Sequence, residues 1–161
     1  MSFPALSSLR ARFGAFAFAS CILAASVLAG TPRVSHIYPG GAQRGGEMEV
    51  TCFGSNLSDA RTIVFDEPGF ESQIVPVDNA KFTAKIKVAP DARLGEHTLR
   101  IITNSGIADV RTFYVSPFPM VAEADSKTRP KPVQHIDLNT TVYGHTPDDA
   151  LARYDVDLKK G

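Results

Sequence analysis

The chain has 161 residues, of which 43% are hydrophobic and 21% charged, which is enough for one ordinary hydrophobic core. Its 17 basic and 17 acidic residues give a formal net charge of zero. A balance of this kind does not attract a polyanion strongly, so we expect no nucleic-acid partner.

The first 29 residues have the pattern of an export signal. Arg10 and Arg12 are the only charged residues before Gly30, and residues 13–29 are all apolar or small. This predicts a secretory signal that is cleaved after Val27-Leu28-Ala29. The alternative is an uncleaved anchor, because a run of about 17 residues is at the lower limit of what spans a bilayer. We therefore expect a secreted, periplasmic or cell-surface protein that meets the membrane only if the signal stays uncleaved.

Cleavage would change the charge and the cysteine content. Loss of Arg10 and Arg12 leaves 15 basic against 17 acidic residues, a net charge of −2. A lipidated Cys21 is disfavoured because the apolar run continues beyond it, so Cys21 would be removed with the signal. Cys52 then has no partner for an internal disulfide, and we interpret it as a small buried hydrophobe.

The middle of the chain alternates apolar and polar residues with period two, which is typical of half-buried strands. The clearest cases are 47–53 and 81–88, in which Met48, Val50 and Cys52, or Phe82 and Ile86, alternate with charged residues or threonine. Five further strands are predicted over 33–38, 62–65, 73–77, 97–103 and 107–115. Glycine, proline and asparagine turns separate them every 8 to 12 residues. About seven such strands predict an all-β fold, a sandwich of two sheets.

The turn residues resemble those of IPT/TIG domains, which are immunoglobulin-like sandwiches. The matching positions are Pro32, Ile37, Pro39-Gly40-Gly41, Gly45-Gly46, Val50-Thr51, Gly54-Ser55-Asn56-Leu57, Val64-Phe65, Val88-Ala89-Pro90, Gly95, Asn104-Ser105-Gly106 and Phe113-Tyr114-Val115. The resemblance covers residues 32–116. It implies a binding or spacing module of a cell-surface receptor, a secreted bacterial protein or a transcription factor.

Composition changes after this domain. Residues 117–133 contain four prolines among charged residues, which predicts a stiff extended linker. Residues 134–144 and 153–161 resemble the first strands of a bacterial pre-peptidase C-terminal domain, a β-sandwich appended to secreted peptidases. Only 28 residues follow Val133, so we expect an incomplete second β module at the start of a larger secreted protein.

No motif indicates catalysis or a cofactor. His36, His97, His135 and His145 lack the spacing of a zinc site, and the chain has neither a Gly-x-Ser-x-Gly elbow nor a phosphate-binding Gly-rich loop. Weak calcium candidates are Asp148, Asp149, Asp155 and Asp157, with a solvated strand face and turn as the competing interpretation. We therefore predict no enzyme and no cofactor.

Two functions remain open. The first is a non-catalytic extracellular or cell-envelope module that spaces, adheres or binds a protein or carbohydrate within a larger protein. The second is a substrate-binding or secretion-assisting accessory region of a secreted peptidase or other hydrolase. A nucleic-acid-binding sandwich is disfavoured by the export signal. Binding is expected in the loops 40–46, 55–60 and 67–72, because loops at sandwich ends carry recognition. The candidate residues are Gly41, Arg44, Ser55, Asn56, Asp59, Glu67 and Phe70.

Overall fold

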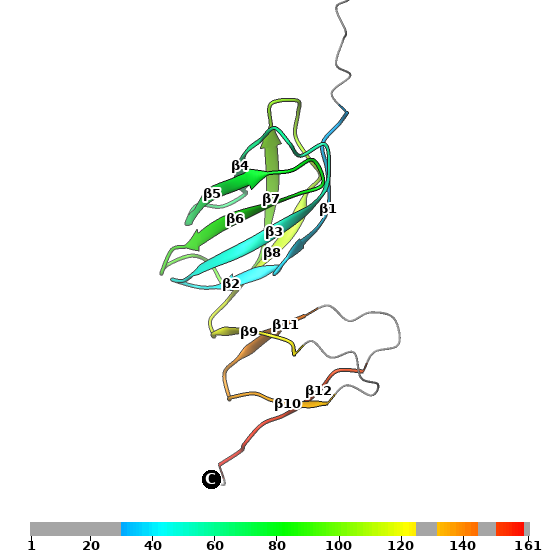
Figure 1. Ribbon diagram of the computed structural model, residues 1–161. Helices are drawn as coiled ribbons and strands as arrows, with labels where there is room; N and C mark the ends of the chain where they lie inside the picture. The colour runs from blue at the N-terminus through cyan, green and yellow to red at the C-terminus, as the bar shows by residue number, and fades with distance from the viewer. Residues whose placement is uncertain (1–29, 125–131, 145–150, 160–161) are drawn as a thin grey trace, which may run out of the picture.

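The computed structural model describes residues 30–124, 132–144 and 151–159 (Figure 1). These ranges contain twelve β-strands and no helix, and therefore no helix that is long and apolar enough to cross a membrane. The predicted signal segment, His145, Asp148 and Asp149 lie outside the described residues. Residues 32–116 form two packed four-stranded sheets, as the alternation in the sequence predicts.

The first sheet, sheet A, is antiparallel throughout and has the order β1-β3-β6-β5. Its strands are β1 (Arg33–Tyr38), β3 (Glu47–Ser55), β6 (Lys81–Val88) and β5 (Phe70–Val77). In β6 every second residue is buried from Phe82 to Val88, and the lysines between them face solvent. This alternation fixes the register, because a slip by one residue would turn the lysines into the core.

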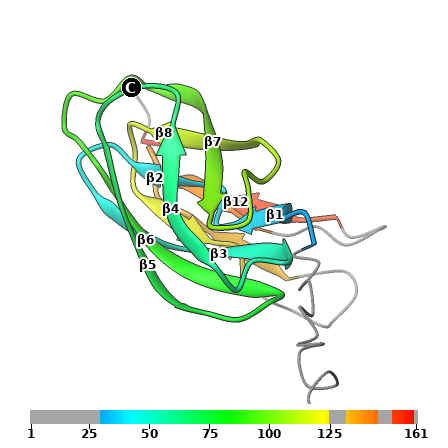
Figure 2. The same cartoon turned by 90° about the horizontal axis from the view of Figure 1, so that it is seen from above.

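The second sheet, sheet B, has the order β2-β8-β7-β4. Its strands are β2 (Gly41–Gln43), β8 (Arg111–Ser116), β7 (Gly95–Thr103) and β4 (Ala60–Phe65). β2 pairs parallel with β8, and the other pairs are antiparallel. Seen from above, β4 and β7 lie in one layer, and β3, β5 and β6 lie in the other (Figure 2).

The core lies between the sheets and is filled by apolar side chains from both. Phe82 and Ile86 of sheet A and Leu99, Ile101 and Phe113 of sheet B are at most 2% exposed. Burying each side chain of this size contributes about 1.5–3 kcal/mol, so these five residues together contribute roughly 8–15 kcal/mol. Cys52 is fully buried in the same cluster and is free, as the sequence predicts.

Two sequence predictions in this domain need correction. The segment 107–115 was expected to be one strand, but β8 begins only at Arg111. Before it, Ile107 makes an isolated bridge to Ile102, and Ala108 alone turns into the core. The expected turn 40–46 contains β2, whose three residues form a short parallel ladder with β8. The apolar residues of the sequence did not show that 41–43 pairs with a strand or that 107–110 stays outside β8.

The sandwich has two ends with different loops. The lower end in Figure 1 carries the segments 39–46, 66–69 and 89–94, which follow β1, β4 and β6. The upper end carries the segments 56–59, 78–80 and 104–110. At the upper end, Asp59 accepts a hydrogen bond from the Ser105 amide at 2.7 Å, and the Leu57 amide donates to the Asn79 carbonyl at 3.2 Å.

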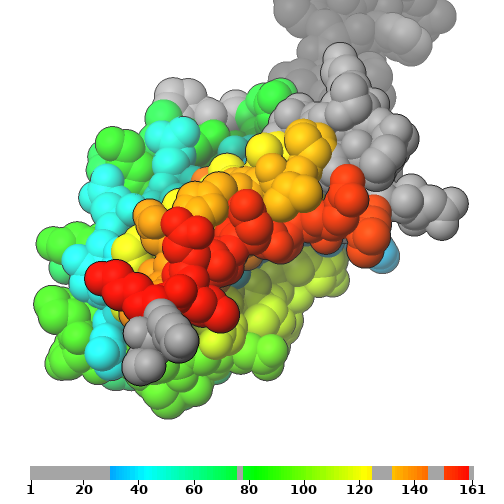
Figure 3. Space-filling model, turned by 90° about the horizontal axis from the view of Figure 1, so that it is seen from below, coloured from blue at the N-terminus to red at the C-terminus, as the bar shows by residue number. Residues whose placement is uncertain are grey.

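The chain leaves the sandwich at the lower end and forms four short strands. β9 (Met120–Ala122) pairs parallel with β11 (Thr141–Tyr143), and β10 (Val133–His135) pairs parallel with β12 (Arg153–Asp155). The region that was expected to be a plain linker therefore contains β9. Figure 3 shows these residues, in yellow, orange and red, lying across the underside of the molecule.

Among the described residues, a pair of hydroxyls and a pair of aromatic rings join this C-terminal segment to the sandwich. The Ser116 and Thr141 hydroxyls are 2.6 Å apart, and the ring centroids of Tyr38 and Tyr143 are 5.6 Å apart in an edge-on arrangement. Leu138, Leu151 and Leu158 remain 54%, 70% and 79% exposed. The apolar side chains of this segment are thus only partly covered by the first domain.

Candidate functional site

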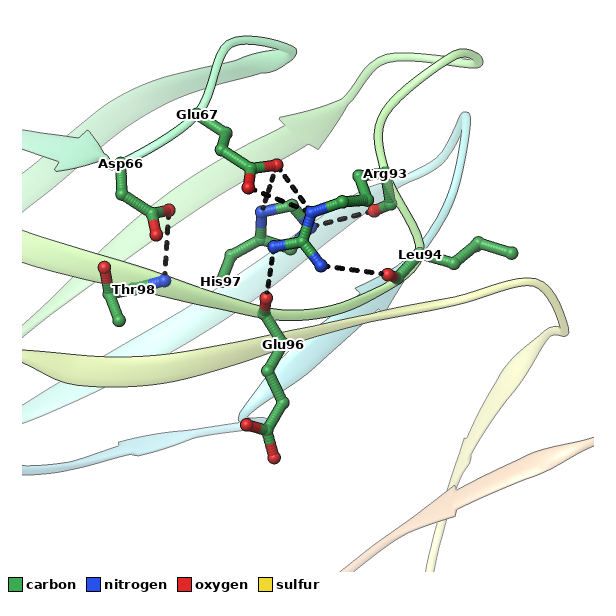
Figure 4. Close-up of polar contacts among 7 residues, drawn as sticks. All are labelled: Asp66, Glu67, Arg93, Leu94, Glu96, His97 and Thr98. Atoms are coloured by element: carbon green, nitrogen blue, oxygen red, sulfur yellow. Dashed lines mark hydrogen bonds and ion pairs between the residues drawn. The ribbon is translucent and has the colours of Figure 1, made fainter.

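The lower end brings four polar side chains together from three segments (Figure 4). Asp66 and Glu67 follow β4, Arg93 lies in the turn after β6, and His97 lies on β7. β4 of sheet B and β6 of sheet A both end at the lower end of the sandwich, and β7 begins there, so all three segments meet at this end. We call Asp66, Glu67, Arg93 and His97 the lower-end cluster.

The centre of the cluster is an ion pair between Arg93 and Glu67. The Arg93 Nε donates to Glu67 Oε1 at 2.9 Å and to Oε2 at 2.8 Å, and its guanidinium also donates to the backbone carbonyls of Glu96 at 2.7 Å and Leu94 at 3.3 Å. The hydrogen bond from Arg93 lowers the pKa of Glu67, and the same bond raises the pKa of Arg93. Both side chains are therefore favoured in their charged forms, and the ion pair links the turn after β4 to the turn after β6.

His97 is enclosed beneath this pair. Its ring is 1% exposed and lies edge-on to Phe70, with a centroid distance of 4.8 Å. Nε2 is 2.8 Å from the Arg93 carbonyl oxygen, which only accepts, so Nε2 carries a proton and donates. Nδ1 then faces Glu67 Oε2 at 3.5 Å without a hydrogen bond. The histidine is held in place by the two turns and is not presented to solvent.

Asp66 closes the cluster on the outer side. Its Oδ1 accepts a hydrogen bond from the Thr98 amide at 3.1 Å, and its own amide donates to the Thr98 carbonyl at 3.1 Å. Desolvation is the largest influence on the Asp66 carboxyl and opposes ionisation. The hydrogen bonds from the Thr98 side chain and backbone nevertheless lower its pKa. Asp66 thus extends the pairing of β4 and β7 by one residue.

Most polar groups of the lower-end cluster have partners within the chain, and the exception among them is His97 Nδ1. Both oxygens of Glu67 accept from Arg93, and the His97 Nε2 proton is used within the chain. The other buried group with catalytic potential is Cys52, and burial raises the pKa of its thiol to about 12. A thiol with that pKa is inert near neutral pH, because the thiolate is the nucleophile. The lower-end cluster therefore links two turns of the sandwich, and Cys52 is part of the hydrophobic core.

Of the four residues, the sequence analysis considered only Glu67 and His97, and it did not foresee the cluster. Glu67 was proposed as a loop residue and His97 as an isolated strand histidine. The signal that could have found the cluster is topological. Turns at Glu67-Pro68-Gly69 and at Pro90-Asp91 both follow strands that run toward the same end of a sandwich.

The three loops predicted to bind a ligand do not form one surface. Residues 40–46 and 67–72 lie at the lower end, whereas residues 55–60 lie at the upper end. At the upper end the Asn56 side chain donates to the Thr31 carbonyl at 3.1 Å, and Asp59 is tied to Ser105. Ser55, in contrast, is exposed.

The predicted residues at the lower end also differ in exposure. Gly41 is buried in β2 opposite Tyr114, and Glu67 is bound to Arg93. Phe70 is half-buried and stacks on Phe65 with a centroid distance of 4.0 Å. Arg44 is exposed. The whole set stays a prediction, with Arg44 the most accessible lower-end member.

Two of the four calcium candidates can be placed. Asp155 Oδ1 is 3.2 Å from His135 Nδ1, and Asp157 Oδ2 is 3.9 Å from His135 Nε2. Across the three described ranges, no group of three or more histidine, cysteine or acidic side chains is arranged to hold a metal. In the described residues the two aspartates therefore lie beside a histidine rather than around a cation site.

A small hollow lies beside this region, between β9, β10 and β12. It is lined by polar and small residues that include Glu123, Gln134 and Arg153, and its volume is about 10 Å³. Such a space holds roughly one water molecule and is too small for an organic substrate. The Gln134 amide spans the same region, accepting from the Ala124 amide at 2.7 Å and donating to the Ala122 carbonyl at 3.0 Å.

The strand order decides the fold. In chain order, β1, β3, β5 and β6 correspond to strands A, B, D and E of an immunoglobulin domain, and β4, β7 and β8 to strands C, F and G. The chain folds as an immunoglobulin-like sandwich. β2 adds a short strand beside G. Antibody domains carry a disulfide between B and F, whereas Cys52 lies on the B-like strand and the F-like β7 has no cysteine.

Comparisons with solved structures find domains of the same class. The Lin-41 filamin domain has 15% identity and a TM-score of 0.40, covering 55% of this chain and 95% of that domain. Domains 5–6 of the S-layer protein SbsC have 11% identity and a TM-score of 0.39, covering 74% of this chain and 58% of that structure. The M1 domain of titin has 12% identity and a TM-score of 0.32, covering 53% and 93%. At these identities the likeness concerns the fold alone. No family model and no curated protein sequence matches the chain.

Proposed function

We propose that this chain is a non-catalytic module that works outside the cytoplasm, as a spacer, adhesion or ligand-binding part of a larger secreted protein. The observation that carries the non-catalytic part of this proposal is the enclosure of His97 and Cys52. His97 is sealed beneath the Glu67–Arg93 pair, and Cys52 is fully buried with a pKa of about 12. The signal pattern before Gly30 supports export.

The first module is proposed to be of the IPT/TIG kind. Its glycine-rich segments support this, because Gly45 and Asn56 adopt positive φ angles of 74° and 55° at the turns that the resemblance requires. The C-terminal segment is proposed to begin a pre-peptidase C-terminal-like module, supported by its short strands and by the exposed Leu138 and Leu158. An accessory role in a secreted hydrolase is the alternative, and it depends on what the parent protein contains.

If the module binds a protein or a carbohydrate, we propose the lower-end loop 40–46 as the contact, because Arg44 is exposed there. The test is binding of the protein to a panel of immobilised polysaccharides and envelope proteins. Arg44→Glu should weaken any binding that is found. The matched control is Arg33→Glu, which makes the same charge change at the exposed start of β1 near the upper end. Binding that is reduced only by the control would contradict the lower-end assignment.

Absence of catalysis is tested directly with ester, peptide and glycoside substrates. No turnover above that of the buffer is expected. Changes at three titratable residues, His97→Gln, Asp155→Asn and Asp109→Asn in the exposed segment before β8, should leave the background unchanged. Hydrolysis that disappears in one of these three variants would overturn the proposal.

A further inference from the structure

The two outer faces of the sandwich differ in charge. On sheet A, Glu47 lies opposite Lys87 and Glu49 opposite Lys85, so the surface is charged and its charges are matched across strands. The outward side chains of β4, β7 and β8 are mostly uncharged, and several of them are β-branched. They include Thr62, Val64, Thr98, Thr112 and Tyr114, all exposed. Val64 is 49% and Tyr114 45% exposed, which places apolar surface on both flanks of β7.

The few charges on this sheet B face are arranged by sign. Glu96 lies near the lower end of β7. Arg100 lies four residues further along the same strand, toward the upper end, and the exposed Arg61 lies near the upper end of β4. Within the described residues, the charged groups of Glu96, Arg100 and Arg61 make no hydrogen bond or ion pair. Asp66, beside Thr98, adds a second acidic group below the middle of the face. The face is therefore acidic toward its lower end and basic toward its upper end.

We propose that the sheet B face binds the same face of a second copy of this chain, with the strand directions of the two copies reversed. Strand residues two apart are separated by about 7 Å. A two-fold axis at Thr98 then places Glu96 of each copy opposite Arg100 of the other. Val64 and Tyr114 on either side of β7 are covered in the same step. This goes beyond the proposed function, which places ligand binding in the loop 40–46 and gives the sheet B face no role.

Charge selects this orientation over the alternative. If the strands of the two copies ran in the same direction, Glu96 would face Glu96 and Arg100 would face Arg100, which is destabilising. In the reversed orientation, Arg61 and Arg100 come over the acidic half of the other copy. The two Asp66 carboxylates approach each other near the axis, and this single like-charge contact reduces the affinity.

The area of the sheet B face indicates how stable such a dimer can be. The three strands β4, β7 and β8 lie about 4.8 Å apart and are at least about 20 Å long, so they present roughly 300 Å² per copy, or about 600 Å² in total. Stable interfaces bury about 1,200 Å² or more. The dimer should therefore be weak and strongly concentration-dependent, without a permanent interface.

Sedimentation equilibrium of the protein that begins at Gly30 tests this directly. The average mass of the wild type should rise toward twice the monomer value as concentration increases. Arg100→Glu should remove the rise, and the double variant Glu96→Arg/Arg100→Glu, which keeps the net charge of the wild type, should restore it. Lys85→Glu, which makes the same charge change as Arg100→Glu on the outer face of sheet A, should leave the rise intact.

Each other outcome contradicts the proposal. A wild type that stays monomeric at the highest concentration shows that the face does not self-associate. Association that persists in Arg100→Glu, or that the double variant does not restore, shows that Glu96 and Arg100 do not meet. Circular dichroism of each variant establishes that the exposed substitutions leave the sandwich folded.

Discussion

The Arg93 Nε lies within 2.9 Å of both Glu67 carboxylate oxygens and so joins the turn after β4 to the turn after β6. The pair covers the buried His97, whose ring packs edge-on against Phe70. The histidine and the carboxylate are thus parts of a link between two turns of an immunoglobulin-like sandwich.

The first prediction concerns pH. Arg93 lowers the folded-state pKa of Glu67 below the unfolded value of about 4.3, so the pair stabilises the fold above that pH and the contribution is lost as pH falls through the folded pKa. Glu67→Gln should lower the melting temperature at pH 7, and the difference from the wild type should shrink as the pH falls. Thermal unfolding at pH 7 and pH 3 measures this. Glu71→Gln is the control, because Glu71 makes only an exposed 3.8 Å pair with Lys87.

The second prediction concerns the loop 40–46. Gly45 has a φ of +74°, which an L-residue adopts at a cost of about 1–2 kcal/mol, whereas a Cβ at Gly40 meets open space. Gly45→Ala should reduce the free energy of unfolding by that amount, and Gly40→Ala should be close to neutral. Urea denaturation of both variants distinguishes them. Equal losses would show that the left-handed turn is not specifically required.

The third prediction concerns the core. Phe113 is fully buried and contacts Phe65 and Phe70 edge-on at centroid distances of 5.5 and 6.2 Å. Phe113→Ala should cost about 3–5 kcal/mol in the free energy of unfolding. Phe118→Ala, at a site that is 39% exposed, should cost clearly less. A small loss at Phe113 would contradict the packing of the two sheets.

The fourth prediction concerns Cys52. Burial raises its thiol pKa to about 12, so at pH 8 the thiolate fraction is lower than that of an exposed thiol by about three orders of magnitude. A thiol reagent should therefore label the native protein that begins at Gly30 very slowly and label it fully in denaturant. Rapid labelling of the native state would show that β3 does not hold Cys52 in the core.

Much of the sandwich could be predicted from the sequence because it is encoded locally. The alternation of Met48, Val50 and Cys52, and of Phe82 to Val88, specifies both strand type and buried face. β9 could not be predicted this way, because its partner β11 lies about twenty residues further along the chain. The lower-end cluster was missed for a similar reason. Glu67 and Arg93 are 26 residues apart, and only the strand order brings them together.

Export is the central claim of the proposed function, and the intact mass of the protein recovered from outside the cytoplasm of a bacterial host tests it most directly. We predict a mature chain that begins at Gly30, and Leu23→Asp, which interrupts the apolar run, should leave the protein uncleaved inside the cell. A full-length chain that begins at Met1 and remains in the cytoplasm would contradict the account.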